Sequence, residues 1–316
     1  MKLYINTKQL AEINVRINEE IELHSVSILK QPQNNSLIFI NKKSKDVDNI
    51  KNIKNSLIIA YLSIFKDYDE LLFSENIVFL IDNPRLCFIK VLTKMVNYNK
   101  IKNYETDFLD LGFSRYVHKN TKIHDSVIIE ANVTIDSNVE INKGSIISSG
   151  SHIKENVIIG EDCFIGSGTV IGNQGFGAER DHDDKIYMMP HIGGVIIKNR
   201  VVIGCNTTIV AGTITPTVIA NEVKIDDLVL VAHNCNIEKS VIICGGSFLG
   251  GSVSIGEKCW IGIGSIVHQS TIIEANATLG IGSVVRRNVK QGTTVIGNPA
   301  QKLSKHIELT RKLRKL

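Results

Sequence analysis

An aliphatic residue returns at every sixth position from Ile123 to Val285, with few lapses. The repeat falls into three blocks, over residues 123–171, 197–209 and 219–285. Neither an α-helix nor the alternation of a half-buried strand has a period of six residues. The pattern is typical of a β-helix of hexapeptide repeats, in which short parallel strands stack in coils. An ordinary β-sandwich, the alternative, would need a turn about every 8–12 residues and could not keep this register.

The other positions of the hexapeptide support this interpretation. The residue two places before the aliphatic one is small or β-branched, so both side chains can point inwards. In the first block these residues are Val127, Val133, Val139, Ser145, Ser151, Val157, Cys163 and Thr169. The places after the aliphatic residue favour Asn, Asp and Gly, which form turns. We therefore predict a mainly β protein, with about three hexapeptides in each triangular coil and roughly eight coils in the stack.

Residues 1–105 lack the period and are predicted to form a separate α/β domain, with a possible role in binding a nucleotide sugar. Its predicted strands are short apolar runs at residues 36–40, 57–62 and 77–81. After them, Asn83 as N-cap and Pro84 as first helical residue predict a helix. The Lys- and Asn-rich stretch 41–55 is expected to be a solvated loop, with a polybasic functional site as the alternative.

The β-helix is assigned to residues 106–300 and a short basic helix to residues 301–316, where aliphatic residues recur at roughly helical spacing among Lys and Arg. Such a helix could meet the phosphates of coenzyme A or the acidic face of an acyl carrier protein. A solvated tail is the alternative.

Two breaks interrupt the repeat. The longer one, residues 173–194, has a polar centre and cannot fit inside a tight coil, so it is expected to leave the scaffold as a loop. Loops on rigid scaffolds often carry function. We expect this loop to close over the acceptor or the acyl carrier. The shorter break covers Thr213-Ile214-Thr215-Pro216.

Composition excludes several classes of function. A formal net charge of +4 over 316 residues is too small to indicate a nucleic-acid partner. No apolar run reaches membrane-spanning length and the start of the chain lacks a secretory segment, so a soluble, cytoplasmic protein is expected. The six cysteines form no C-x-x-C pair, which argues against a zinc knuckle or a redox motif. Cys163, Cys235 and Cys259 occupy the small inward position and are predicted to be packed thiols.

Four motifs in and beside the breaks are distinctive: Gly175-Phe176-Gly177, Pro190-x-Ile192-Gly193, Gly204-Cys205-Asn206-Thr207-Thr208-Ile209 and Val231-Ala232-His233-Asn234. In combination they resemble the UDP-3-O-(3-hydroxyacyl)glucosamine N-acyltransferases of lipid A synthesis, and relatives that N-acylate nucleotide-linked amino sugars. The resemblance covers most of the chain. It implies a left-handed β-helix, a homotrimer, and active sites in the grooves between subunits.

The chemistry of such a site requires a base for the attacking amine and a donor for the oxygen of the thioester as it becomes negative. Histidine titrates near neutrality, and His233 follows an inward-facing residue, so it should lie outside the core. The resemblance matches it to the family's catalytic base. Gly251 follows eighteen residues later, which is three hexapeptides, so both should lie on the same face. The resemblance makes its backbone N–H the oxyanion donor; a simple Gly-Gly corner with Gly250 is the alternative.

The resemblance also implies substrate-binding roles for Gly175, Phe176, Gly177, His191, Asn234, His268 and Gln269. The second active-site histidine of the lipid A enzymes aligns with Gln269, and His268 stands beside it. Their uracil-stacking aromatic residue has no counterpart near residues 42–44. Asp226 and Asp227 could orient His233, although a solvated turn is the preferred interpretation for them.

The carboxyl end resembles the exit motif of coenzyme A-dependent hexapeptide acyltransferases. This resemblance assigns acyl-CoA binding to Gly297, Asn298, Pro299, Ala300 and Lys302. Neither a metal nor a permanently bound cofactor is expected. The predicted function is transfer of an acyl group, possibly 3-hydroxyacyl, from acyl-CoA to the amine of a nucleotide-linked amino sugar. The alternative is the lipid A N-acyltransferase itself, using acyl carrier protein.

Two other classes remain open. A hydratase of the γ-carbonic anhydrase type would need three converging histidines, for which His191, His233 and His268 are irregularly spaced. A solenoid that only scaffolds partners is the other class.

Overall fold

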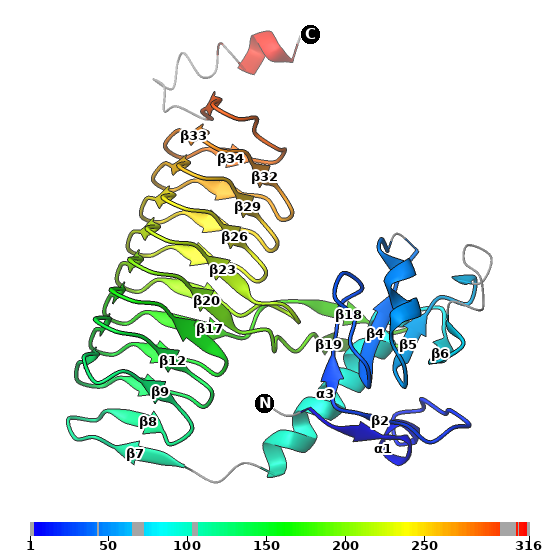
Figure 1. The fold of residues 1–316 in the computed structure, drawn as a ribbon. Coiled ribbons are helices and arrows are strands. Elements are labelled where there is room, and N and C mark those ends of the chain that lie inside the picture. Colours follow the sequence, from blue (N-terminus) through cyan, green and yellow to red (C-terminus); the bar gives the residue numbers. More distant parts are fainter. Residues whose placement is uncertain are drawn as a thin grey trace.

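The computed structural model describes residues 3–42, 44–64, 73–102, 107–297, 308 and 310–314. Its larger part is a tall stack of coils, with the N-terminal part beside the lower half of the stack (Figure 1). Three long sheets form the faces of the stack, as the six-residue period predicted. The fold is mainly β and consistent with a left-handed parallel β-helix.

The chain visits the three faces in turn within each coil. The first face is a sheet of β7 (Phe108–Asp110), β8 (Tyr116–His118), β11 (Thr134–Ile135), β14 (His152–Ile153), β17 (Val170–Asn173), β22 (Thr208–Val210), β25 (Leu230–Val231), β28 (Phe248–Leu249), β31 (Ile266–Val267) and β34 (Val284–Val285). The second face consists of β9 (Lys122–Ile123), β12 (Glu140–Ile141), β15 (Val157–Ile159), β20 (Val195–Ile197), β23 (Thr217–Ile219), β26 (Asn236–Ile237), β29 (Ser254–Ile255) and β32 (Ile272–Ile273). The third face consists of β10 (Ile128–Ile129), β13 (Ile146–Ile147), β16 (Phe164–Ile165), β21 (Val202–Ile203), β24 (Lys224–Ile225), β27 (Ile242–Ile243), β30 (Trp260–Ile261), β33 (Thr278–Leu279) and β35 (Thr294–Val295). All paired neighbours in these faces are parallel except β7 and β8.

The register of the stack follows directly from the repeat. Val231 of β25 pairs with Leu249 of β28, which pairs with Val267 of β31, each eighteen residues further on. These aliphatic side chains point inwards and form one continuous core. Burying a side chain of this size contributes about 1.5–3 kcal/mol, so the ladder of aliphatic residues dominates the stability of the stack.

The small inward residues make a second ladder of hydrogen bonds. The hydroxyl of Ser145 donates to the carbonyl oxygen of Gly160 at 2.8 Å, and the thiol of Cys235 donates to that of Gly250 at 3.3 Å. Burial raises the pKa of the Cys235 thiol to about 12. All six cysteines are free, and the predicted packing of Cys163, Cys235 and Cys259 is confirmed.

The N-terminal part contains a parallel sheet in the order β3-β4-β5-β6. Its elements are β1 (Ile5–Asn6), α1 (Thr7–Ala11), β2 (Glu22–Leu23), β3 (Ser25–Val26), β4 (Ser36–Ile40), the 3-10 helix η1 (Val47–Asn52), β5 (Leu57–Ala60), β6 (Ile77–Leu80) and α3 (Pro84–Lys102). The predicted start of the helix is confirmed, because the Asn83 side chain accepts a hydrogen bond from the Leu86 backbone N–H at 3.0 Å.

The expected solvated loop over residues 41–55 is wrong in part. Its centre forms η1, whose Val47 and Ile50 side chains are buried. They pack with Ile38, Ile40 and other side chains of the sheet in a cluster separate from the one that contains the α3 side chains. Because Val47 and Ile50 are three residues apart, their side chains lie on the same side of a 3-10 helix. The many Lys and Asn residues around them led the sequence analysis to predict a loop.

The longer break leaves the stack as expected and forms a hairpin of β18 (Ala178–Arg180) and β19 (Ile186–Met188). The hairpin reaches from the solenoid to the N-terminal part (Figure 1). There Met189 is buried in the cluster that contains the α3 side chains, and Arg85 of α3 pairs with Glu179 at 3.2 Å. The hairpin therefore joins the two parts, while its ends, which carry Gly175 and His191, lie against the stack. Closure of this segment over a substrate stays a prediction.

At the C-terminal end, residues 310–313 are helical, as predicted for that segment. Asn298, Pro299, Ala300 and Lys302, four of the five residues assigned to acyl-CoA, lie outside the described residues. Within the described part of the chain, no helix combines the length and apolar character needed to cross a membrane.

Candidate active site

Nearly every unusual feature of the solenoid lies at one edge, where the chain turns from the first face to the second. We name this edge the first corner. It carries the hairpin after β17, the shorter break between β22 and β23, and then His233, Gly251 and Gln269 in successive coils. Corner residues eighteen places apart stack vertically, so the repeat itself gathers these residues on one edge.

His233 lies directly against Gly251. A β-carbon added to Gly251 would come within 2.5 Å of His233 Nε2 and 2.6 Å of its Cε1. The next residue keeps the regular register, since the Ser252 N–H donates to the carbonyl oxygen of His233 at 2.8 Å. The predicted stacking of the two residues is thus observed, and it explains why residue 251 lacks a side chain.

Asn234 orients the His233 ring. Its Oδ1 lies 3.1 Å from His233 Nδ1 and also accepts hydrogen bonds from the backbone N–H and the hydroxyl of Thr213, while its Nδ2 donates to the carbonyl oxygen of Thr215 at 2.9 Å. These contacts identify the oxygen of the amide, so His233 Nδ1 must carry the proton that points at it. The lone pair of His233 is therefore on Nε2, the atom beside Gly251.

Three threonines hold this orienting amide, two from the shorter break and one, Thr217, at the start of β23. Thr213 and Thr215 bind the Asn234 side chain, and the Thr217 hydroxyl accepts from its backbone N–H at 2.9 Å. The sequence marked this segment only as an irregularity. A cluster of hydroxyl residues at a break could have pointed to a supporting role, but only contacts between neighbouring coils reveal which amide they support.

A second histidine completes the contact. His191, 3% exposed, places its ring centroid 5.0 Å from that of His233, with the planes tilted by 60°. Its Nδ1–H donates to the carbonyl oxygen of Met189 at 2.9 Å, and the side chain of Gln174 binds its backbone N–H and C=O. Burial, followed by the nearby His233, lowers the pKa of His191 to about 4, so the ring is neutral.

The oxyanion-donor hypothesis for Gly251 concerns the peptide between Gly250 and Gly251. In the described part of the chain the Gly251 N–H has no hydrogen-bond acceptor. The carbonyl oxygen of the same peptide, on Gly250, accepts from the Cys235 thiol. A thiol on the inner side therefore steadies a peptide whose N–H faces the corner, which is an arrangement that an oxyanion donor needs.

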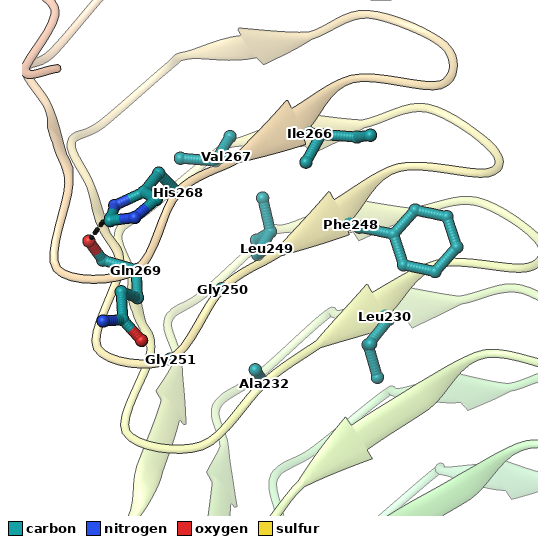
Figure 2. Close-up of a pocket in the computed structure, with 10 residues that line it drawn as sticks. All are labelled: Leu230, Ala232, Phe248, Leu249, Gly250, Gly251, Ile266, Val267, His268 and Gln269. Carbon is teal, nitrogen blue, oxygen red and sulfur yellow. Dashed lines mark hydrogen bonds between the residues drawn. The ribbon is translucent and has the colours of Figure 1, made fainter. Parts of the chain in front are cut away.

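A shallow apolar pocket leads from this corner onto the first face. Leu230, Phe248 and Ile266 project from three neighbouring strands on one side of it, and Gly251 and Gln269 lie at the turn (Figure 2). Phe248 and Ile266 are 48% and 47% exposed, so the pocket presents apolar surface that suits an aliphatic ligand.

The remaining predicted residues lie in different places. Gly175 packs on the His191 ring, where an added β-carbon would come within 2.4 Å of Nε2, and Gly177 lies beside Met189. Phe176 between them is 85% exposed. His268 and Gln269 line the pocket one coil above Gly251, with His268 Nδ1 bound to the carbonyl oxygen of Gln269.

Asp226 and Asp227, which the sequence offered as possible orienters of His233, lie at a different corner. They occupy the corner between the third and first faces, where they accept hydrogen bonds from the Gly245 and Cys205 N–H groups. The turn interpretation of these residues is confirmed. Among the described residues no three His, Cys, Asp or Glu side chains gather as a metal site requires.

Gly297, the described residue of the five assigned to acyl-CoA binding, lies near Val284 at the upper end of the stack.

Family comparisons first define the class. A family model described as "Bacterial transferase hexapeptide (six repeats)" matches residues 120–155 and 138–173. The matched residues lie in the lower coils of the solenoid, whose three sheets show the same hexapeptide repeat.

The individual relatives confirm the resemblance that the motifs indicated. A UDP-3-O-acylglucosamine N-acyltransferase of Methylococcus capsulatus is 35% identical over 140 residues, which is 44% of this chain and 39% of the relative. A probable mitochondrial enzyme of the same name from Arabidopsis thaliana is 37% identical over 130 residues, 41% of this chain and 43% of the relative. The chain thus spans about two fifths of the length of these curated relatives. Among solved structures, an Arabidopsis UDP-N-acetylglucosamine acyltransferase is 24% identical, covers 64% of this chain and 81% of its own, and has a TM-score of 0.48.

Proposed function

We propose that the chain is an N-acyltransferase that transfers an acyl group from a thioester carrier to the amine of a nucleotide-linked amino sugar. The observation that carries this proposal is the His233 ring, held by Asn234 with its Nε2 lone pair free and lying against Gly251 beside an apolar pocket. A base, an unpaired backbone N–H and an apolar groove are the three parts that this reaction needs.

In the proposed reaction the amine nitrogen attacks the carbonyl carbon of the thioester, and a new N–C bond forms. His233 Nε2 accepts the proton that the nitrogen loses, while the Gly251 N–H stabilises the oxygen as it becomes negative. The C–S bond then breaks, and the sulfur takes the proton from the imidazolium. The products are an amide and a free thiol carrier, and His233 returns to its starting state.

The acceptor and donor are narrower proposals. The sequence favoured acyl-CoA first and the lipid A enzyme with acyl carrier protein as the alternative. The named relatives favour the alternative, because they are UDP-3-O-acylglucosamine N-acyltransferases. We therefore propose UDP-3-O-acylglucosamine as the type of acceptor and an acylated carrier protein as the donor, in the cytoplasm. The apolar side chains of Phe248 and Ile266 would accommodate the acyl chain.

The N-terminal part is proposed to bind the nucleotide. Ligands of open parallel sheets bind at the carboxyl ends of the strands. At that end the Lys42 ammonium, which follows β4, lies 5.1 Å from the ring centroid of Tyr61, which follows β5. The sequence showed no aromatic counterpart near residues 42–44, but Tyr61 lies beside Lys42 after the neighbouring strand. We propose that Tyr61 stacks on the base.

A homotrimer is also part of the proposal. In the upper coils the first face presents Phe248 outwards and the third face presents Ile242 and Trp260. The second face is more polar, with Asn236 and Ser254 below Ile272. The corner between the first and third faces carries exposed Ile263 and Ile281. Two apolar faces that meet at an apolar corner suit packing around a threefold axis. Light scattering should give three times the monomer mass; a monomer at working concentration would contradict an active site between subunits.

The decisive experiment is a screen of acylated carrier protein and acyl-CoA against a panel of nucleotide amino sugars, with products identified by mass spectrometry. We expect an amide on the UDP-linked amino sugar, formed faster from the carrier protein. Acylation by acyl-CoA alone would revise the donor. Failure to bind any acyl thioester would favour the scaffold alternative, and stoichiometric zinc lost together with activity would favour the hydratase.

A further inference from the structure

We infer that His191 is a second hydrogen-bond acceptor for the attacking nitrogen and that it makes the site selective for amines over hydroxyl groups. This inference rests on the proposed function, because it concerns the acceptor of that same reaction. It gives a role to a buried histidine of the first corner that base catalysis by His233 leaves unused.

The first argument is the state of the ring. The carbonyl oxygen of Met189 can only accept, so the 2.9 Å contact places the proton of His191 on Nδ1 and a lone pair on Nε2. Each buried side-chain nitrogen and oxygen in the described residues has a partner, and His191 Nε2 has none there. Nε2 must therefore retain some accessible surface. Because the ring stays neutral above about pH 4, this lone pair is present under physiological conditions.

The second argument is geometric. Gly175 packs against the Nε2 end of the His191 ring as Gly251 packs against that of His233: an added β-carbon would come within 2.4 Å and 2.5 Å of the two nitrogens. Both glycines thus leave room for the Nε2 end of a histidine ring, in space that a side chain would otherwise fill. With the ring centroids 5.0 Å apart, one nitrogen atom at the edge of the two rings could reach both Nε2 atoms, because two hydrogen bonds of about 3 Å span about 6 Å.

The chemistry of the acceptor then distinguishes two nucleophiles. A neutral amine has two N–H groups and one lone pair, so it can give one proton to His233, donate the other hydrogen to His191, and attack with the lone pair. A hydroxyl group has one hydrogen and leaves one acceptor unpaired. Sites built to pair with a particular N–H or O–H reject analogues that lack it. His191 keeps its own proton throughout and takes none from the substrate.

The position of His191 is secured from outside the solenoid. Met189, whose carbonyl oxygen accepts from the ring, has its side chain in the core that includes α3. Gln174 holds the backbone of His191 on the other side through paired hydrogen bonds of 2.9 Å. The hairpin therefore acts as a rigid arm between the N-terminal part and the acceptor site.

The test uses two replacements of similar size. Gln in place of His191 can keep an acceptor near the position of Nε2, whereas Asn keeps a polar group only near Nδ1. His191→Asn should lower kcat/KM for the amine acceptor by about tenfold to a hundredfold, and His191→Gln should restore much of this loss. His182→Asn, on the exposed turn of the same hairpin, is the matched control and should behave as the wild type.

A second substrate separates chemistry from structural damage. The matching nucleotide sugar with a hydroxyl group in place of the amine should react slowly with the wild type. His191→Asn should react with it no more slowly, so the ratio of kcat/KM for amine over hydroxyl should fall by the factor that the amine reaction loses. The inference would be overturned if His191→Asn lost the same factor of kcat/KM on both substrates, or if it kept wild-type rates. His233→Ala tests the proposed function separately from this result. If His191→Asn does not fold, Gly175→Ala, whose methyl group would overlap the His191 ring and displace Nε2, should reduce the same preference. An unchanged preference would count against the inference.

Discussion

Two corners of the same coils use the same backbone in opposite ways. At the corner between the third and first faces, Asp226 accepts from the Gly245 N–H and Asp227 from the Cys205 N–H. At the first corner the equivalent N–H of Gly251 has no acceptor in the described residues, and the His233 ring lies against it. A backbone donor that stabilises the fold at one edge is left available at the other. The corner side chains, and not the coil, therefore decide where chemistry can occur.

The largest expected effect comes from His233→Ala. Loss of the general base should lower kcat/KM by about 10²–10⁴-fold, while the melting temperature changes little, because the ring lies outside the aliphatic core. The limb of the pH–rate profile that belongs to the histidine should vanish, whereas a limb from the amine should survive.

Asp227→Ala at the other corner is the control for that variant. It removes an acceptor for the Cys205 N–H, so stability should fall by about 1 kcal/mol with activity retained. Wild-type rates in His233→Ala at every pH would refute the assignment of the base.

The next effect is that of Gly251→Ala. The new methyl group would overlap His233 Nε2, so the ring must turn away, and a misplacement of about 1 Å can reduce the rate about a hundredfold. Gly245→Ala is the matched change at the other corner, where the nearest atom, Asp226 Oδ2, is 3.1 Å from the added β-carbon. Steady-state kinetics of both variants should show a large loss only for Gly251; similar losses would argue against a special role for the first corner.

Acid should weaken the first corner more than the rest of the protein. The pKa of His191 is lowered in the folded state from 6.5 to about 4, so the unfolded chain binds a proton that the folded one does not. The stabilisation by the neutral ring is complete above pH 6.5 and is lost as the pH falls towards 4. Denaturant unfolding of the wild type and His191→Gln should diverge over this window by up to about 3 kcal/mol. Parallel curves would show that the buried ring is not protonated on unfolding.

The smallest effect concerns Cys235, whose thiol supports the Gly250–Gly251 peptide. Cys235→Ala should lower kcat about two- to fivefold, because a weak hydrogen bond to that peptide is lost. Cys235→Ser should retain more activity. Cys259→Ala removes a similar bond, to the Glu274 carbonyl oxygen, away from the site and should leave kcat unchanged. Equal rates for both alanine variants would show that the thiol only fills space.

The sequence predicted most of the solenoid because a regular repeat converts spacing into position. An eighteen-residue interval placed Gly251 against His233, and the small inward cysteines were recognised as packed thiols. The prediction was weaker where the period stops. Residues 47–52 became a 3-10 helix, since Val47 and Ile50 could bury their side chains against the sheet.

By itself, then, the sequence determined the coils, their register and the histidine–glycine stack, since these depend on contacts repeated at a fixed interval along the backbone. Only the tertiary structure decided the contact between His191 and His233, the support of Asn234 by Thr213 and Thr215, and the docking of the hairpin on α3. Those contacts join segments with no common period. They depend on which side chains fit together once the N-terminal part packs against the hairpin, and no local pattern of residues encodes that fit.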